Sequence, residues 1–591
     1  MIRLKFALLA ALTVALPPLC AIAQNHAPEI ATGRAAKQDA RFHREGVAAA
    51  NPLAVEAGFA MLAQGGSAID AAVATQLVLG LVEPQSSGLG GGAFIVMHDA
   101  KAPLGHRTRT YDGRETAPGA AKPTRFVGAD GLPLKFHDAA VGGKSVGVPG
   151  TVALMAEVHR KHGRLPWKAL FAPAIALAEA GFPVSPRLHM QLKSERFLKT
   201  DTVAREYFYR PDGEPWPVGY GLKNPAYAAT LRAIADGGVD AFYRGPIATD
   251  IVNAVRAHVN AGDLTEADFS AYRVFERAPV CTRYRGYRVC GMPAPSSGGT
   301  AVAQMLASLE RFPLANWRPD SAQMLDSVHV MAEAGRLAFA DRNRFLADPD
   351  FVHIPGGLLD LDYLNSRAAL IDPTRSMKRA EPGQPRGAQL ALAEDASVDI
   401  PGTSHISIVD RYGNAVAMTT TIEDQFGARM MVRGFLLNNE LTDFSFLPAD
   451  DGRRVANRIE PGKRPRSSIA PTIVYDRAGQ PVIVTGSPGG SAIINYVVKS
   501  LVGLIDWGMT PQAVADAPNF GSRNGPTEIE KGTPLEALKP ALEARGHSVA
   551  VLEFTSGLHV LARERLGRDG LASGRWLGGA DPRREGVVIG R

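Results

Sequence analysis

Apolar runs at helical spacing dominate the first 350 residues of the chain. Residues 52–64 follow Asn51, a favourable helix cap, and precede two glycines, so they are predicted to form a helix. Residues 68–82 are apolar on nearly every side, which predicts a buried helix. Helical patterns return over residues 150–275 and 321–347, with breaks at prolines and glycines. The first part of the chain is therefore predicted to be mainly helical.

The pattern changes to strands after a polar stretch rich in proline and glycine, residues 372–402, which is the best linker in the chain. Residues 404–410 and 414–421 alternate in polarity, as half-buried strands do. Between them, residues 411–413 suit a three-residue hairpin loop that ends on a left-handed glycine. A hairpin symmetric about Tyr412 is therefore predicted.

This hairpin would place Thr421 directly opposite Thr403, close enough for the two hydroxyls to form a hydrogen bond. Thr403 also follows the linker and a glycine, which suits a chain cut between Gly402 and Thr403. An N-terminal threonine has its own base, because its free α-amine can accept the hydroxyl proton near neutral pH. The alternatives are a solvated strand hydroxyl at Thr403 and cross-strand threonine pairing that only stabilises the sheet.

A second feature with chemical potential lies further along the chain. Residues 473–475 and 481–485 are predicted to form another hairpin, and residues 491–507 an almost wholly apolar helix. Between them, Gly489 and Gly490 would expose backbone N–H groups at the positive end of this helix, where an anion binds well. A phosphate loop would need a lysine, and none occurs before Lys499. The oxyanion of a tetrahedral intermediate is therefore favoured, with a structural turn as the alternative.

The N-terminal 23 residues have the pattern of a secretory signal. Arg3 and Lys5 precede an apolar stretch, and an Ala-Ile-Ala sequence at 21–23 suits cleavage before residue 24. A lipoprotein signal at Cys20 is the alternative, although Leu19 is bulky for one. No later run reaches the roughly 18 apolar residues of a membrane span. The mature protein is expected to be periplasmic or secreted.

Export bears on the other two cysteines. Cys281 and Cys290 flank a predicted hairpin that turns at residues 285–286, which would place them opposite each other with Cα atoms roughly 4.5 Å apart. A disulfide is favoured by an oxidising compartment, and two reduced cysteines in a strand are the alternative.

The amino-acid composition excludes few other classes of function. The chain has 591 residues, of which 45% are hydrophobic and 21% charged, as in an ordinary globular protein. The net charge is +6, but the basic residues are scattered, and the densest run, residues 463–466, is too short for a nucleic-acid footprint. The glycines at 88–92 lead from a helix into a strand, the reverse of a dinucleotide fingerprint. No cofactor and no metal are expected.

Taken together, these stretches resemble the gamma-glutamyltranspeptidase family of the N-terminal-nucleophile hydrolase class. The resemblance covers roughly residues 44 to 587. Several long motifs in the same order are far more specific than any one of them. The matching stretches are residues 65–72, 88–92, 113–118, 149–151, 293–299, 403–405, 437–440, 443–445, 463–465, 467–468 and 486–490.

The resemblance implies an α+β fold, a four-layer αββα sandwich built from two autoprocessed subunits. Cleavage at Gly402-Thr403 would give a large subunit of residues 24–402 and a small one of residues 403–591, which stay together as a heterodimer. The implied activity is acyl transfer from γ-glutamyl compounds such as glutathione. The alternatives are a glutaryl or cephalosporin acylase on the same fold and a non-catalytic periplasmic binding or scaffold protein.

The resemblance also implies roles for single residues. A bidentate arginine suits a carboxylate, and acidic side chains suit an ammonium, so the implied set would hold the zwitterionic head of a γ-glutamyl group. Glu423 stands where the family typically has an asparagine, and it could also accept from the ammonium. The implied roles are Thr403 as nucleophile with Thr421 as its partner, Gly489 and Gly490 as oxyanion donors, Arg114, Ser467 and Ser468 at the α-carboxylate, and Glu440 and Asp443 at the α-ammonium.

Overall fold

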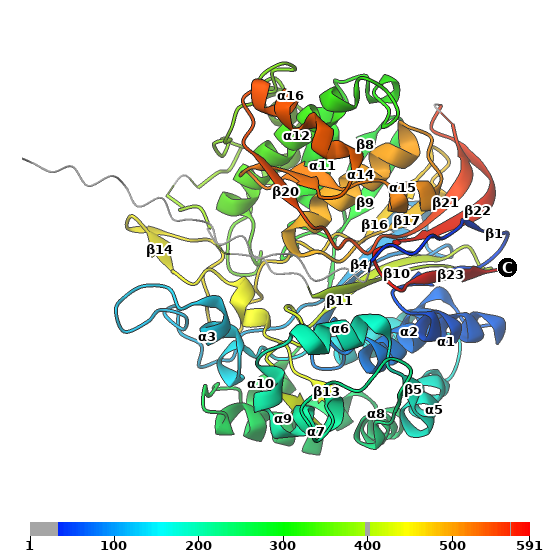
Figure 1. Ribbon diagram of the computed structural model, residues 1–591, viewed down its shortest axis with the longest axis vertical. Helices are drawn as coiled ribbons and strands as arrows, with labels where there is room; N and C mark the ends of the chain where they lie inside the picture. The colour runs from blue at the N-terminus through cyan, green and yellow to red at the C-terminus, as the bar shows by residue number, and fades with distance from the viewer. Residues whose placement is uncertain (1–32, 390, 396, 398–401, 568) are drawn as a thin grey trace, which may run out of the picture.

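The computed structural model describes residues 33–389, 391–395, 397, 402–567 and 569–591 (Figure 1). The predicted signal peptide, residues 1–23, and residues 398–401, directly before Gly402, lie outside the described residues. None of the helices in the described ranges is both long and apolar enough to span a bilayer.

Two seven-stranded antiparallel sheets form the centre of the molecule. The first sheet has the order β1 (Ala40–Phe42), β22 (Ala572–Ala580), β21 (His559–Leu566), β17 (Pro481–Thr485), β16 (Thr472–Tyr475), β9 (Tyr287–Gly291) and β8 (Val280–Tyr284). The second has the order β23 (Val587–Gly590), β2 (Gly46–Ala49), β10 (Thr403–Val409), β11 (Ala415–Thr421), β3 (Gly92–His98), β4 (Thr108–Gly113) and β7 (Phe275–Arg277). The sheets pack face to face, with β10 and β11 against β21, β17 and β16.

Helices cover the outer face of each sheet, which gives four layers in the order αββα (Figure 1). The helices on the side of the second sheet are α1 (Pro52–Ala63), α2 (Ala68–Val82), α4 (Thr151–His162), α5 (Ala172–Ala180), α6 (Pro186–Ser194), α7 (Thr202–Phe208), α8 (Pro225–Tyr243), α9 (Pro246–Ala257) and α10 (Glu266–Ala271). Those on the side of the first sheet are α11 (Gly298–Leu309), α12 (Met324–Phe345), α14 (Ile493–Ile505), α15 (Pro511–Asp516) and α16 (Lys539–Ala544).

The local predictions around the second sheet are confirmed. Asn51 caps α1 by accepting a hydrogen bond from the Leu53 amide, and α2 is buried along its whole length. β10 and β11 pair in the predicted register, which sets Thr403 opposite Thr421. The loop between them ends on Gly413, whose φ of 87° is the left-handed conformation that glycine adopts readily. Because both strands lie between a helical layer and the first sheet, every residue of each is buried.

The predicted cysteine hairpin is also present. β8 and β9 turn at Arg285 and Gly286, and their register pairs Cys281 with Cys290. Their Cα atoms lie 4.1 Å apart, and the sulfur atoms form a disulfide. Of the two alternatives that the sequence left open, the structure has the bonded one.

Two predictions differ from the structure. The predicted helix 491–507 is shorter, because Gly489 and Gly490 have positive φ and a 3-10 turn, Gly490–Ala492, precedes α14. The predicted linker has no helix or strand over residues 372–389, but it packs against α12, where Ser376 and the Met377 amide donate hydrogen bonds to Glu333. Side-chain hydrogen bonds to a buried carboxylate hold this segment without secondary structure.

Candidate functional site

Thr403 and Thr421 begin and end the central hairpin of the second sheet. The Thr403 hydroxyl lies 3.3 Å from the Thr421 hydroxyl and donates to it. Thr421 in turn donates to the Gly402 carbonyl at 2.6 Å and accepts from the Glu423 amide at 2.8 Å. The hydroxyl of Thr421 therefore orients the Thr403 hydroxyl and polarises the carbonyl of the peptide bond before it.

Gly402 is fixed by a close approach of the chain that follows β11. A Cβ atom at Gly402 would lie 2.6 Å from the carbonyl carbon of Asp424, which is too close for any other residue. Glu423 has a φ of 79°, an unusual conformation for a residue with a side chain, and it turns the chain back toward Gly402. The peptide bond between Gly402 and Thr403 is thus held against a strained turn.

A pocket opens at this peptide bond and collects most of the predicted site residues. Thr403 and Thr421 lie in its wall together with Arg114, which directly follows β4, and with residues from the turn Glu440–Asp443 and from the start of α14. Ser467 and Gly489 are absent from the wall, although their neighbours in sequence line it. We call it the threonine pocket, and its lining residues are Arg114, Thr403, Thr421, Glu423, Glu440, Asp443, Ser468, Ile469, Gly490 and Ile493.

The single arginine of the threonine pocket is already paired with carboxylates. Arg114 is buried and forms ion pairs with Glu440 and Asp443, and it also donates to the carbonyls of Pro465 at 3.2 Å and Arg466 at 3.1 Å. The resemblance assigns Arg114 to the α-carboxylate and the two acids to the α-ammonium, which are attached to the same carbon of a γ-glutamyl group. In the structure Arg114 and the two acids are neighbours, so a bound zwitterion would meet one compact group of charges.

The threonine pocket holds three acidic side chains and one arginine. Burial raises the pKa of Glu440, and Arg114 opposes this. Burial also raises the pKa of Glu423 well above its usual range, and the nearby Asp443 adds to the rise. Oε1 of Glu423 is buried and has no hydrogen-bond partner among the described residues. A ligand with a positive charge would supply the partner that this carboxylate lacks.

Residues that the sequence did not single out support the pocket. Arg342 on α12 donates to the Ser468 hydroxyl at 2.6 Å and to the Ser297 hydroxyl at 2.9 Å. Asn439 donates to Glu423 and accepts from the Asp424 amide at 3.0 Å. Asn439 lies inside the matching stretch 437–440, so the sequence could have identified it as a site residue. No sequence motif could have identified Arg342, because only the fold brings α12 to the pocket.

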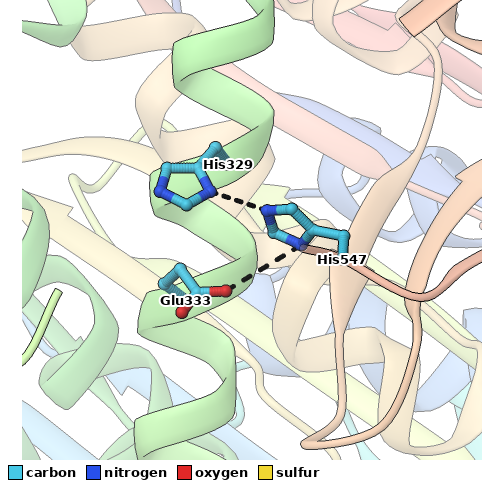
Figure 2. A group of neighbouring side chains, drawn as sticks. All are labelled: His329, Glu333 and His547. Atoms are coloured by element: carbon cyan, nitrogen blue, oxygen red, sulfur yellow. Dashed lines mark hydrogen bonds and ion pairs between the residues drawn. The ribbon is translucent and has the colours of Figure 1, made fainter. Parts of the chain in front are cut away.

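A second buried group of polar side chains lies on α12, far from Thr403 in sequence (Figure 2). His329 and Glu333 are one helical turn apart on α12, and His547 comes from the segment before β20 (Val549–Leu552). Two histidines and a glutamate are a common set of metal ligands, so the hydrogen bonds of the group decide what it can hold.

These hydrogen bonds fix the proton on each ring. Nε2 of His329 lies 2.7 Å from the Asp372 carbonyl and must donate to it. Nδ1 of His329 then accepts from Nε2 of His547 at 2.6 Å, and Nδ1 of His547 accepts from the Thr527 hydroxyl at 2.7 Å. Burial lowers the pKa of both histidines, that of His547 to about 4, so both are neutral.

Both oxygens of the Glu333 carboxylate also have hydrogen-bond partners. Glu333 accepts from Arg336 at 3.0 Å and from Ser376 and the Met377 amide at 2.8 Å. A metal bound at about 2.1 Å would need its nitrogen ligands farther apart than the 2.6 Å between the two rings. The group is a hydrogen-bonded network rather than a metal centre. We call His329, Glu333, Arg336, Thr527 and His547 the histidine network.

Comparisons with known proteins agree with this geometry. Residues 54–591 match the family model described as gamma-glutamyltranspeptidase. The glutathione hydrolase proenzyme of Bacillus subtilis (strain 168) is 36% identical over 554 residues, which is 92% of this chain and 91% of that protein. The Acylase ACY 1 proenzyme of Pseudomonas sp. (strain SE83) is 34% identical over 530 residues, 88% of this chain and 90% of that protein.

A solved structure resembles the fold over nearly its full length. The cephalosporin acylase from Bacillus halodurans covers 95% of this chain and 99% of its own, with a TM-score of 0.79 and 27% identity. Glutathione hydrolases and acylases thus both match most of this chain. The chain belongs to the gamma-glutamyltranspeptidase family.

Proposed function

We propose that the chain is an exported, self-cleaving enzyme that transfers the acyl group of γ-glutamyl compounds such as glutathione to water or to an amine. The observation that carries the proposal is the hydrogen-bond chain from the Thr403 hydroxyl through Thr421 to the Gly402 carbonyl at the edge of an acidic pocket. Its family relatives described as proenzymes support cleavage of the chain.

Self-cleavage would use the same hydroxyl as catalysis. Oγ1 of Thr403 attacks the Gly402 carbonyl, the peptide C–N bond breaks, and the acyl group moves to oxygen as an ester. Water then hydrolyses the ester, which leaves Gly402 with a carboxylate and Thr403 with a free α-amine. The products are subunits of residues 24–402 and 403–591, which remain associated because β10 and β11 stay paired with β2 and β3 of the large subunit.

In the mature enzyme the free α-amine of Thr403 takes the hydroxyl proton as the oxygen attacks the γ-carbonyl. Amides at Gly489 and Gly490 would hold the oxyanion at the start of α14. The amine then gives its proton to the leaving group, and an acyl-enzyme remains. Water, with its proton taken by the same amine, releases glutamate and restores Thr403.

Substrate choice follows from the charge of the pocket. The α-ammonium of a γ-glutamyl group would meet Glu423, Glu440 and Asp443, and its α-carboxylate would meet Arg114, Ser467 and Ser468. A glutaryl group has no ammonium and would leave the buried carboxylate of Glu423 unpaired, which costs free energy. The excess of acids therefore favours γ-glutamyl over glutaryl substrates.

Two measurements test the proposal. The purified protein should run as two bands on a denaturing gel, with Thr403 as the first residue of the smaller fragment. It should also hydrolyse γ-glutamyl-p-nitroanilide faster than glutaryl-p-nitroanilide. A single uncut band without activity would favour a non-catalytic binding or scaffold protein.

The second candidate is an acylase that removes glutaryl-like side chains from β-lactams. The full-length similarity to a cephalosporin acylase structure favours this candidate. It would use the same Thr403 nucleophile, and faster release from glutaryl-p-nitroanilide would select it.

A further inference from the structure

The connection between β22 and β23 crosses from the first sheet to the second next to Thr403. Its backbone is held firmly. Nζ of Lys37 donates to the carbonyls of Asp581 and Arg584, both at 2.7 Å. The Asp581 carboxylate accepts from the Ser556 hydroxyl at 2.6 Å and from the Leu558 amide at 3.1 Å. The side chains of this connection therefore occupy defined positions.

Arg584 extends from this connection to the nucleophile. Its side chain is buried, with a relative exposure of 1%. Nη1 donates to the carbonyl oxygen of Thr403 at 3.1 Å, and Nη2 donates to the carbonyl of Thr555 at 3.2 Å. The guanidinium thus ties the residue that would be the N-terminus of the small subunit to the segment between β20 and β21.

The same side chain lies beside the segment that leads to the predicted oxyanion site. A Cβ atom at Gly557 would be 2.6 Å from Cγ of Pro488 and 2.8 Å from Cδ of Arg584, so both side chains pack against this glycine. The Gly557 amide also donates to the Ser487 hydroxyl at 3.1 Å. Arg584 is therefore placed between the nucleophile and the segment before Gly489.

Arg583, the neighbouring arginine, is engaged differently. It pairs with Asp581 at 3.0 Å and with both oxygens of Glu530 at 2.7 Å, and it reaches the carbonyls of Ala515 and Ala517. None of these contacts involves Thr403. Adjacent buried arginines thus offer a matched pair, one in contact with the nucleophile and one holding the fold.

We propose that Arg584 is a positioning residue for Thr403, which anchors the carbonyl of the nucleophile and sets a fixed positive charge beside its α-amine. The inference rests on the proposed function, because the amine exists only after cleavage at Gly402-Thr403. The proposal gives the connection between β22 and β23 a role in the chemistry of Thr403.

The charge of Arg584 matters because of the other charges around Thr403. The pocket carboxylates favour the protonated amine, and a protonated amine cannot act as the base. Burial lowers the pKa of His405 and of His559, the latter to about 3, so neither adds positive charge. Arg584 opposes the carboxylates and favours the neutral amine. Among the described residues, the charged groups that face Thr403 are Arg114, Glu423, Glu440 and Asp443 in the pocket and Arg584 from the C-terminal connection.

The test compares pH profiles of kcat/KM for γ-glutamyl-p-nitroanilide in wild type, Arg584→Gln, Arg584→Lys and the control Arg583→Lys. Loss of the charge should raise the pKa of the amine, so the acidic limb in Arg584→Gln should move up by about one pH unit. In Arg584→Lys, which keeps the positive charge, the acidic limb should lie close to that of wild type. In Arg583→Lys the acidic limb should not move. A fall in kcat with an unmoved acidic limb would show a merely structural role and overturn the proposal.

A second measurement needs no variant and covers the case in which Arg584→Gln does not fold. The Thr403 amine of the processed wild type is labelled with an amine-selective reagent across a pH series, and mass spectrometry follows the small subunit's first peptide. The denatured protein gives the reference. The pocket carboxylates raise the pKa of the amine and Arg584 lowers it, and we expect Arg584 to outweigh them, so the half-labelling pH of the native amine should lie below that reference. A value above it would mean that the carboxylates set the charge of the amine, which would overturn the proposal.

The two proposals fail in different ways. A wild type that is uncut and inactive has no Thr403 amine, which overturns the proposed function and this inference together. A wild type that is cut and active, with an unshifted acidic limb in Arg584→Gln, overturns only the role of Arg584.

Discussion

The threonine pocket and the histidine network are both buried groups of charged and polar side chains, but they are satisfied to different degrees. In the histidine network every ring nitrogen and carboxylate oxygen has a hydrogen-bond partner. In the threonine pocket an oxygen of Glu423 has none among the described residues, and one arginine faces three acids. An incomplete buried network leaves room for a ligand to complete it, whereas a complete one stabilises the fold.

The most severe test of this comparison is Thr403→Ala. One hydroxyl would serve both acyl transfers, so this variant should remain a single uncut chain and lose at least about 1,000-fold in kcat/KM. A denaturing gel and the γ-glutamyl-p-nitroanilide assay measure the two effects. The histidine network does not involve Thr403, so the denaturation midpoint should change little. Cleavage at the same bond in Thr403→Ala would place the nucleophile elsewhere.

The hairpin of Thr403 could be predicted because its signals are local. Alternation of polarity, a three-residue loop and the glycine at 413 fix the register within 19 residues, and the structure has the same register. The two cysteines followed from the same kind of argument. Continuous apolar character also located α2, because a helix buried on every side has no polar face to interrupt the run.

The pairing of Arg114 with Glu440 and Asp443 could not be predicted in this way. It joins residues more than 300 positions apart, and it depends on the order of strands in the second sheet. Arg342, His547 and Arg584 were missed for the same reason, since each reaches its partner from another layer or another sheet. The pattern analysis also made no prediction for β21 and β22, where polar residues at the strand ends weaken the alternation.

The same chemical change in both groups should separate their roles. Glu423→Gln removes the carboxyl group that would ionise beside the α-ammonium, so KM for γ-glutamyl-p-nitroanilide should rise about tenfold, with little change in stability. The ratio of γ-glutamyl to glutaryl hydrolysis should fall by a similar factor. A ratio equal to that of wild type would remove Glu423 from substrate recognition.

Glu333→Gln is the matched change in the histidine network. It leaves the buried charge of Arg336 without its carboxylate and should cost about 2–3 kcal/mol of stability in urea denaturation. The ratio of γ-glutamyl to glutaryl hydrolysis should stay as in wild type. If Glu333→Gln changed that ratio more than Glu423→Gln did, the division between a ligand pocket and a structural network would be wrong.

The smallest expected effect is a pH dependence of stability that comes from the histidine network. Burial lowers the pKa of His547 from 6.5 to about 4, so between these values the unfolded chain binds a proton that the folded chain does not. Stability should therefore be highest above pH 6.5 and fall as the pH drops toward 4, by about 3 kcal/mol from this residue. In His547→Gln this position no longer titrates, while His329 still does. The variant should be less stable than wild type at pH 7.5, because the hydrogen bonds to His329 and Thr527 change, yet it should lose less stability between pH 7.5 and 4.5.

Urea denaturation of both proteins at the two pH values measures these losses of stability. Comparing the two losses cancels the contribution of carboxylates that titrate equally in both proteins. Equal losses in wild type and His547→Gln would mean that the ring is protonated in the fold and that the hydrogen-bond directions assigned to the network are reversed.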